Sequence, residues 1–333
     1  MYRSACLFIA VSVLLVYLVS FARRGPLTSR HQIGIEDNRA SVASHQLSIE
    51  DNVALYQRYS VATRERVVHD VFNGLDNLRP WEGLKGGYYL WDFFPPMFNC
   101  PLRERFGKFS EGGKVLCNFA AVATDKNCVV FSFGVRDDIS FEVDLMKRSH
   151  CKIFAFDPSV QSLPDGSQSM KSCNGQSAIH FNSVGIGAVS TTSIDEKTQF
   201  KLSNLADLMS QVNVEKIDLL KMDIEGGEWE VFRQLSSSGI LRNVDQLSIE
   251  LHFKQSKTNN AGKNSGIHEV FDFFAAVEKS GLLAFSSEVN HNPSGFFESK
   301  PYCIEYTFVR PHSRYMTSEP MLSVEQACRG KQS

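Results

Sequence analysis

From Cys128 onward, short apolar segments rich in Val, Ile and Phe alternate with segments of helical periodicity. Apolar runs without a polar face predict strands buried on both sides, and helical connections between such strands make them parallel. The strand-like segments are Val129–Phe133, Lys152–Phe156, Ile179–Val184, Ile217–Met222, Gln246–Leu251, Leu282–Val289 and Tyr302–Val309. The helix-like segments are Ile139–Arg148, Leu202–Gln211, Glu228–Ser236 and Ile267–Ser280. The pattern therefore predicts an α/β domain.

The last two strand-like segments are joined by a loop alone, at 290–301, so we expect them to pair antiparallel. The predicted fold is a doubly wound, seven-stranded, mainly parallel sheet with an antiparallel last strand. Ligands of such sheets bind outside the carboxyl ends of the strands, near the point where the strand order reverses. The residues that follow each strand are therefore the candidates for function.

The overall composition excludes some classes of protein. Hydrophobic residues make up 43% and charged residues 22% of the 333 residues, which excludes a disordered chain. The 35 Lys and Arg residues against 37 Asp and Glu give a net charge of -2, without the basic excess of nucleic-acid-binding proteins. We therefore expect no nucleic-acid partner.

The first residues form a candidate membrane segment. Ala5 to Ala22 contains no charged residue and is flanked by Arg3 and by Arg23. At about 1.5 Å per residue, a helix of this length just spans a hydrocarbon core of about 30 Å. We interpret residues 1–26 as a signal anchor, with a cleaved signal peptide as the alternative. The positive-inside rule alone would place the rest of the chain in the cytosol.

Cysteine usage favours the opposite side of the membrane. Eight cysteines are many for a cytosolic chain, and none forms a Cys-x-x-Cys pair, which argues against a zinc ribbon. Cys100 and Cys117 lie in an irregular stretch where a disulfide would stabilise most, so we predict that they pair. Cys128 and Cys151 directly precede apolar strands, and we expect buried thiols there. We predict a single-pass membrane protein facing the Golgi or endoplasmic reticulum lumen, or a secreted protein if the signal is cleaved.

A short repeat follows the first segment. His31–Asn38 recurs as His45–Asn52 with a period of 14 residues, and two copies are too few for a solenoid. We therefore interpret residues 27–65 as a stalk, 66–315 as the globular domain and 316–333 as a tail.

Two strand ends carry candidate ligand-binding residues. Gly134 follows the first strand, where it would let the backbone approach a ligand closely or would meet a steric need of the turn alone. Asp137, Asp138 or Ser140 can cap the next helix. Asp157 follows the second strand, about 20 residues after the glycine turn, where an acid can bind ribose hydroxyls. The alternative for Asp157 is a turn-capping residue before Pro158.

The fourth and fifth strands carry the strongest signal. Acidic residues within and beside a buried strand are costly unless they are paired or functional, and Asp223 and Glu225 follow the fourth strand. Glu250 and His252 end the fifth strand two residues apart, so both point to the same side. Since the two strands should be neighbours, we expect these four side chains at one edge of the sheet.

The segment IDLLKMDIEGGEWEVF resembles the signature of FkbM-like class I S-adenosylmethionine-dependent methyltransferases, which have a Rossmann-like fold. RFGKFSEGGKVLCN and CVVFSFGVRDDISFE are similar to the methyltransferase-like 24 type of eukaryotic protein, which often carries an N-terminal membrane or signal segment. The resemblance covers about 100–309. It implies S-adenosylmethionine as cofactor, held by Phe133, Gly134, Arg136, Asp137, Asp157, Val184, Gly185 and Asp223.

Methyl transfer requires an aligned acceptor and removal of its proton, because the sulfonium donor is already activated. We infer a catalytic group of Glu225, Glu250 and His252, with His252 as base and Glu250 orienting it. This predicts oxygen-directed transfer to a glycan or small molecule of the secretory pathway. We expect no metal, and a metal held by Asp223 and Glu250 is the alternative.

Two other functions remain open. The acidic Asp223-Ile-Glu225 triplet could present a metal and a nucleotide sugar, as in a lumenal glycosyltransferase. The first turn lacks a full glycine motif, which would suit a noncatalytic protein that retains the fold. The missing G-x-G-x-x-G also disfavours a nicotinamide dehydrogenase.

Overall fold

The computed structural model describes residues 47–78, 90–109, 112–164, 179–191, 200–253, 265–290, 296–297, 300–301, 303–311 and 314–316. The candidate membrane segment, the first repeat copy and the 317–333 tail lie outside these residues. No helix in the described part of the chain is long and apolar enough to cross a membrane.

A seven-stranded sheet forms the centre of the domain, with the order β10-β13-β9-β8-β3-β4-β5. Its strands are β3 (Val129–Phe133), β4 (Lys152–Phe156), β5 (Ile179–Asn182), β8 (Ile217–Met222), β9 (Val244–His252), β10 (Leu283–Val289) and β13 (Cys303–Val309). All neighbours pair parallel except β13, which is antiparallel to both β9 and β10. The predicted doubly wound fold with an antiparallel last strand is confirmed.

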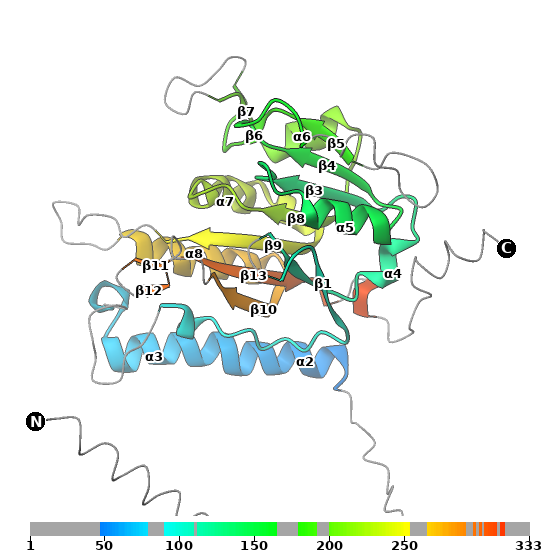
Figure 1. Cartoon of the computed structure of the whole chain (residues 1–333). Helices are drawn as coiled ribbons and strands as arrows, with labels where there is room; N and C mark the ends of the chain where they lie inside the picture. Colours follow the sequence, from blue (N-terminus) through cyan, green and yellow to red (C-terminus); the bar gives the residue numbers. More distant parts are fainter. Residues whose placement is uncertain are drawn as a thin grey trace, which may run out of the picture. The chain divides into compact units, whose positions relative to one another are not determined.

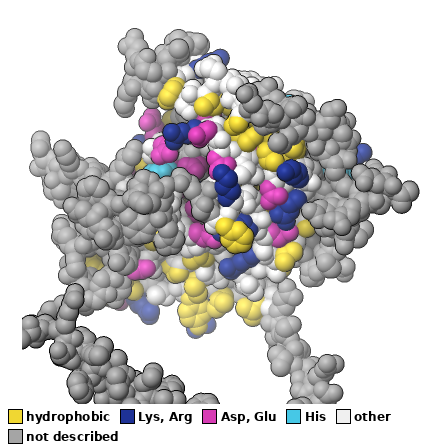
Figure 2. All heavy atoms as spheres, viewed as in Figure 1, with side chains coloured by type: hydrophobic (Ala, Val, Ile, Leu, Met, Phe, Trp, Pro, Cys, Tyr) yellow, Lys and Arg dark blue, Asp and Glu magenta, His cyan; other side chains and the backbone are white. Residues whose placement is uncertain are grey.

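The strand register brings the carboxyl ends of the inner strands together. Phe133 of β3 pairs with Phe156 of β4 on one side and with Met222 of β8 on the other, and Met222 pairs with Ile249 of β9. The arrowheads of β4 and β9 point in the same direction in Figure 1, towards the edge where the predicted site residues follow. Acidic and basic side chains are mixed across the described surface of this view (Figure 2).

Helices cover both faces of the sheet. On one face, α7 (Glu228–Ser238) packs against α8 (Ser265–Lys279), and Phe273 of α8 contacts Phe308 of β13 edge-on. On the opposite face lie α5 (Ser140–Arg148) and a short hairpin of β1 (Arg103–Phe106) and β2 (Lys114–Cys117), in front of the strands in Figure 1. The remaining short elements are α4 (Ala120–Ala123), β6 (Gly185–Ile186), β7 (Leu202–Ser203), α6 (Leu205–Gln211), β11 (Phe296–Phe297) and β12 (Lys300–Pro301).

The folded unit begins earlier than the sequence predicts. It starts at Leu47, and α2 (Ile49–Tyr56), a π-helical turn (Gln57–Val61) and α3 (Ala62–Phe72) lie beside β10 in Figure 1. The Tyr56 hydroxyl donates to Glu278 of α8 at 2.9 Å, and the buried Arg64 forms an ion pair with the same carboxylate at 2.7 Å. Residues 47–65 therefore belong to the domain, and the stalk boundary at residue 65 is wrong.

A hairpin outside the main sheet contributes a residue to the candidate site. This β1–β2 hairpin lies in a stretch where the sequence predicts irregular structure. The predicted Cys100–Cys117 disulfide is present and ties the start of the hairpin to its end. The Gln246 side chain of β9 exchanges two hydrogen bonds with the Cys117 backbone, so the hairpin docks on the sheet.

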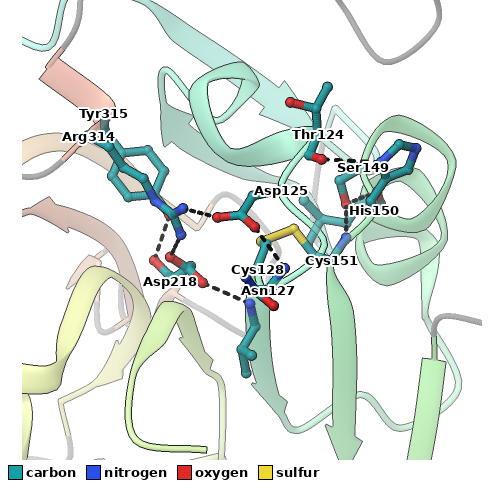
Figure 3. The surroundings of a disulfide bond; sticks show 12 residues. Thr124, Asp125, Asn127, Cys128, Ser149, His150, Cys151, Asp218, Arg314 and Tyr315 are labelled. Carbon is teal, nitrogen blue, oxygen red and sulfur yellow. Dashed lines mark hydrogen bonds and ion pairs between the residues drawn. A yellow bond between two sulfur atoms is a disulfide. The ribbon is translucent and has the colours of Figure 1, made fainter. Parts of the chain in front are cut away.

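The prediction of free thiols at Cys128 and Cys151 is wrong, because these residues form a disulfide (Figure 3). They precede the neighbouring parallel strands β3 and β4, and the parallel register brings the two starts together. Arg314 lies nearby and bridges Asp125 and Asp218, which fixes the C-terminal segment at the same edge of the sheet. This edge is opposite to the strand ends that carry the candidate site.

Replacing Cys128 and Cys151 together with alanine is expected to lower the free energy of unfolding by about 3 kcal/mol. The bond closes a loop with a sequence separation of 23, and its loss increases the entropy of the unfolded chain. Chemical unfolding of the oxidised wild type and of the double variant measures the difference. A double variant as stable as the wild type would show that this bond contributes nothing.

Candidate functional site

A cleft of about 1380 Å³ opens above the carboxyl ends of β3, β4 and β8. Seven of the eight predicted cofactor residues line it, and the eighth, Val184, does not. The seven are Phe133, Gly134, Arg136, Asp137, Asp157, Gly185 and Asp223. The volume suits a nucleotide-sized ligand, and the position agrees with the binding place of doubly wound sheets.

Asp157 anchors the turns on both sides of the cleft. One of its carboxylate oxygens accepts the Arg136 backbone N–H at 2.8 Å, and the other accepts the backbone N–H and the hydroxyl of Ser159. Asp157 is buried, and Arg136 has a left-handed φ of 40°. The turn-capping role that the sequence left open is therefore present, and the same carboxylate lines the cleft.

Of the two reasons for a glycine at position 134, the structure supports the steric one. Its φ is +76°, and a Cβ built there would lie 1.6 Å from the Asp223 carbonyl oxygen. The missing side chain makes room for the neighbouring strand end, not for a ligand. The Lys221 ammonium donates to the Gly134 carbonyl at 2.8 Å and holds the two strand ends together.

Gly134→Ala is expected to destabilise the domain by about 2–6 kcal/mol, combining overpacking with left-handed strain. Gly239→Ala is the matched control, because Gly239 has a similar φ of +72° but no atom within 4 Å of its Cβ position. The control isolates the strain, about 1 kcal/mol. Equal unfolding free energies for the two variants would contradict the close approach at Asp223.

The turn after β8 is built around a buried carboxylate. Glu225 has a left-handed φ of 58° and its side chain is 77% exposed, so it projects from the turn beside the cleft. The fully buried Glu228 accepts the backbone N–H groups of Ile224 and Gly226 at 3.1 and 3.2 Å. Glu228 therefore fixes the turn that presents Asp223 and Glu225.

His252 lies between two carboxylates. Its Nδ1 is 3.0 Å from Glu228 Oε1, and its Nε2 is 3.6 Å from Glu225 Oε2. The prediction that Glu250 orients this ring is wrong, because Glu228 makes the close contact. Burial opposes protonation of the ring, but Cys303 and Glu228 outweigh it and raise the pKa of His252 to about 11. The surroundings thus favour a positive charge at this position.

A buried lysine lies among the other acidic groups. Lys114 of β2 is 2% exposed, forms an ion pair with Glu305 of β13, and has its Nζ 3.6 Å from Asp223. Glu250 belongs to the same cluster and accepts the Asn290 side-chain amide at 2.8 Å. The cluster therefore holds three carboxylates around one ammonium.

The crowding of charge shifts the pKa values in opposite directions. Burial and the carboxylates of Asp223 and Glu305 raise the pKa of Glu250 to about 8. Burial also raises the pKa of Glu305. Burial opposes ionisation of Asp223, but Lys114 and Lys221 outweigh it and lower its pKa. Asp223 is thus the ionised member of the cluster that faces the cleft.

The structure brings the four predicted strand-end residues, Asp223, Glu225, Glu250 and His252, to one edge of the sheet. Sequence reasoning missed Lys114, Glu228, Glu305 and Cys303 as members of this site. A signal existed for Glu305, since a carboxylate in an inner strand is costly without a partner. The partner could not be identified, because Lys114 reaches it from a hairpin 191 residues earlier.

A family model described as a methyltransferase domain matches residues 57–310 of the chain, which include the sheet, the cleft and the acidic cluster. The chain belongs to this methyltransferase-domain family. The match begins inside the predicted stalk, in agreement with the packing of Tyr56 and Arg64.

Two proteins of similar sequence are also named as methyltransferase-like. The human "Probable methyltransferase-like protein 24" is 28% identical over 152 residues, which cover 45% of this chain and 39% of that protein. The rat protein of the same name is 28% identical over 143 residues, covering 43% and 38%. The matched part thus spans less than half the length of these relatives.

Solved structures with a similar arrangement are distant. The FkbM methyltransferase of Methylobacillus flagellatus is 11% identical with a TM-score of 0.32, covering 55% of this chain and 44% of that one. Aeropyrum pernix fibrillarin, solved with bound S-adenosyl-L-methionine, is 9% identical with a TM-score of 0.29, covering 63% and 84%. The strand order described above, and not these superpositions, establishes the fold.

Proposed function

We propose that this methyltransferase-domain protein transfers the methyl group of S-adenosylmethionine to a hydroxyl oxygen of a glycan or small molecule in the secretory pathway. The observation that carries the proposal is the position of the cleft next to the acidic cluster. The cleft has a buried carboxylate at the end of β4, where a ribose would bind, and Asp223 stands between cleft and cluster. One side can hold the donor and the other the acceptor.

Methyl transfer requires few further roles of the protein. The donor sulfonium is already activated, so the residues must orient the acceptor and take its proton. Glu250 is our proposed proton acceptor, because it adjoins Asp223 and is held in place by Asn290, and its ionised form, favoured above its pKa of about 8, can take the proton. His252 is less suited to accept the proton, because carboxylates of Glu228 and Glu225 lie beside its two ring nitrogens. This revises the expectation that His252 is the base.

The proposed compartment is the secretory pathway, with the chain anchored or released by its first segment. The two disulfides among the described residues support it, because such bonds persist in oxidising compartments. The uncharged run from Ala5 to Ala22 supports membrane targeting. The net charge of -2 supports an acceptor other than nucleic acid.

The test is transfer of a carbon-13 methyl group from S-adenosylmethionine to fractionated acceptor pools, with NMR analysis of the product. We expect the label on oxygen, and a label on nitrogen or carbon would contradict the oxygen assignment. Turnover without S-adenosylmethionine would contradict the donor.

Glu250→Gln is expected to lower turnover about 100- to 10,000-fold, the usual contribution of a positioned acid or base. Its dissociation constant for S-adenosylmethionine should stay within about twofold of wild type, because Glu250 does not line the cleft. His268→Ala, which removes an exposed ion pair between α8 and Asp76, is the control and should retain turnover. Full turnover of Glu250→Gln would remove Glu250 as the proton acceptor.

A further inference from the structure

Three metal-binding side chains of different types meet beside the cleft. Glu250 and His252 lie two residues apart on β9 and share one side of the strand. Cys303 of β13 pairs directly with His252 in the antiparallel register. One potential ligand atom from each residue lies within 4.8 Å of the other two.

The surroundings of His252 match those of a metal-ligating histidine. Such a histidine typically hydrogen-bonds a carboxylate through its other ring nitrogen, which fixes the ring orientation. Here Glu228 Oε1 is 3.0 Å from Nδ1, and Glu228 is itself held by two backbone N–H groups. The ring is thus fixed with Nε2 as the nitrogen that can bind an ion. Asn290 holds the Glu250 carboxylate in a similar way.

The second cluster of ligand-type residues is less suitable. Asp223, Glu250 and Glu305 also lie within 4.8 Å of one another. The Lys114 ammonium pairs with Glu305 and lies 3.6 Å from Asp223, so a cationic group already balances these carboxylates. A divalent ion would meet repulsion from this ammonium. The side of Glu250 that faces His252 and Cys303 carries no lysine or arginine ion pair among the described residues.

We propose that Glu250, His252 and Cys303 bind one divalent transition-metal ion of the zinc class. A thiolate, an imidazole and a carboxylate form a donor set that suits zinc and disfavours magnesium or calcium, which prefer oxygen alone. Binding releases to solvent the protons of the Cys303 thiol, the His252 imidazolium and the Glu250 carboxyl group, so that the three residues ligate as thiolate, neutral imidazole and carboxylate. The sequence predicts no metal, with a metal held by Asp223 and Glu250 as the alternative, and it does not point to His252 or Cys303 as ligands.

Three protein ligands leave the fourth position of a tetrahedral ion open. Asp223 and Glu225, which line the cleft, lie next to this ligand set, so the open position can take an oxygen of the acceptor. This role rests on the proposed methyl transfer, whereas the metal site itself does not. The ion would polarise the acceptor hydroxyl and ease the transfer of its proton to the Glu250 carboxylate oxygen that does not bind the ion.

The test uses the full chain, stripped with a chelator and titrated with cobalt(II) as a spectroscopic substitute for zinc. We expect one equivalent to bind, with the intense visible bands of a tetrahedral site and a sulfur-to-cobalt charge-transfer band. Cys303→Ser should lose the charge-transfer band. Glu228→Gln should weaken binding about 10- to 100-fold, as loss of a carboxylate behind a ligating histidine does. His268→Ala is the matched histidine control and should bind as wild type does.

The same samples are titrated with S-adenosylmethionine to separate the two proposals, and thermal unfolding shows whether each variant is folded. A folded wild type that binds S-adenosylmethionine but no cobalt overturns the metal site alone. An unchanged spectrum in Cys303→Ser and His252→Ala also overturns it, because the ion then binds elsewhere.

Discussion

Lys114→Met is expected to lower the free energy of unfolding by about 3–5 kcal/mol, the usual cost of removing one partner of a buried ion pair. The lysine is 2% exposed and balances Glu305 and Asp223, with Glu250 adjacent. Methionine retains the length of the side chain but leaves these carboxylates without their cation. Chemical unfolding at neutral pH measures the loss.

The double variant Lys114→Met/Glu305→Gln is the control for this interpretation. It removes the positive charge and one negative charge together, so we expect it to recover much of the lost stability. Lys216→Met provides a second comparison, because Lys216 also pairs with a buried carboxylate, Asp245, but is itself 56% exposed. Its effect should be about 1 kcal/mol or less. Equal losses at positions 114 and 216 would contradict a buried charge cluster.

Asp157→Ala is expected to weaken S-adenosylmethionine binding about 100-fold or more. Two hydrogen bonds from ribose hydroxyls to a buried carboxylate would contribute about 3 kcal/mol together, and each 1.4 kcal/mol is tenfold in affinity. Calorimetric titration gives the dissociation constant, and Asp157→Asn separates the charge from the size of the side chain.

Because Asp157 also anchors two turns, the measurement needs a structural control. Ser159→Ala removes one of its internal hydrogen-bond donors and leaves the carboxylate intact, so affinity should stay near the wild-type value. Asp137→Ala changes a carboxylate that is 86% exposed at the rim of the cleft and should alter affinity by less than about fivefold. An Asp157→Ala protein that binds S-adenosylmethionine normally would exclude this residue from the donor site.

The sheet could be predicted from the sequence because its strands are buried on both faces. Three strands begin and end at the predicted residues: Val129–Phe133, Lys152–Phe156 and Ile217–Met222. Continuous apolar runs of this length indicate buried strands. The antiparallel pairing of β13 followed from the loop at 290–301. These features depend on local pattern alone.

The missed features depend on contacts between distant parts of the chain. The Cys128–Cys151 bond forms because β3 and β4 pair in parallel register, which the positions of single cysteines do not reveal. The hairpin strand around Lys114 is four residues long and follows two glycines, so its pattern resembles a loop. The ion pair between Lys114 and Glu305 joins β2 to β13.

The location of the candidate site could be predicted from the sequence, but the contacts within it could not. Asp223, Glu225, Glu250 and His252 meet as expected because β8 and β9 are neighbours. The partner of His252 was misassigned to Glu250, since sequence spacing shows which side of a strand a residue faces but not how a turn folds back. Glu228 reaches the ring because the positive φ values at Glu225 and Gly226 reverse the chain.

The cleft above β3, β4 and β8 is the proposed S-adenosylmethionine site. The most direct measurement is calorimetric titration of the folded wild-type chain with S-adenosylmethionine and, separately, with a nucleotide sugar in the presence of manganese. We predict one S-adenosylmethionine bound per chain and no binding of the nucleotide sugar. A folded protein that binds the nucleotide sugar, or binds neither compound, would contradict the claim.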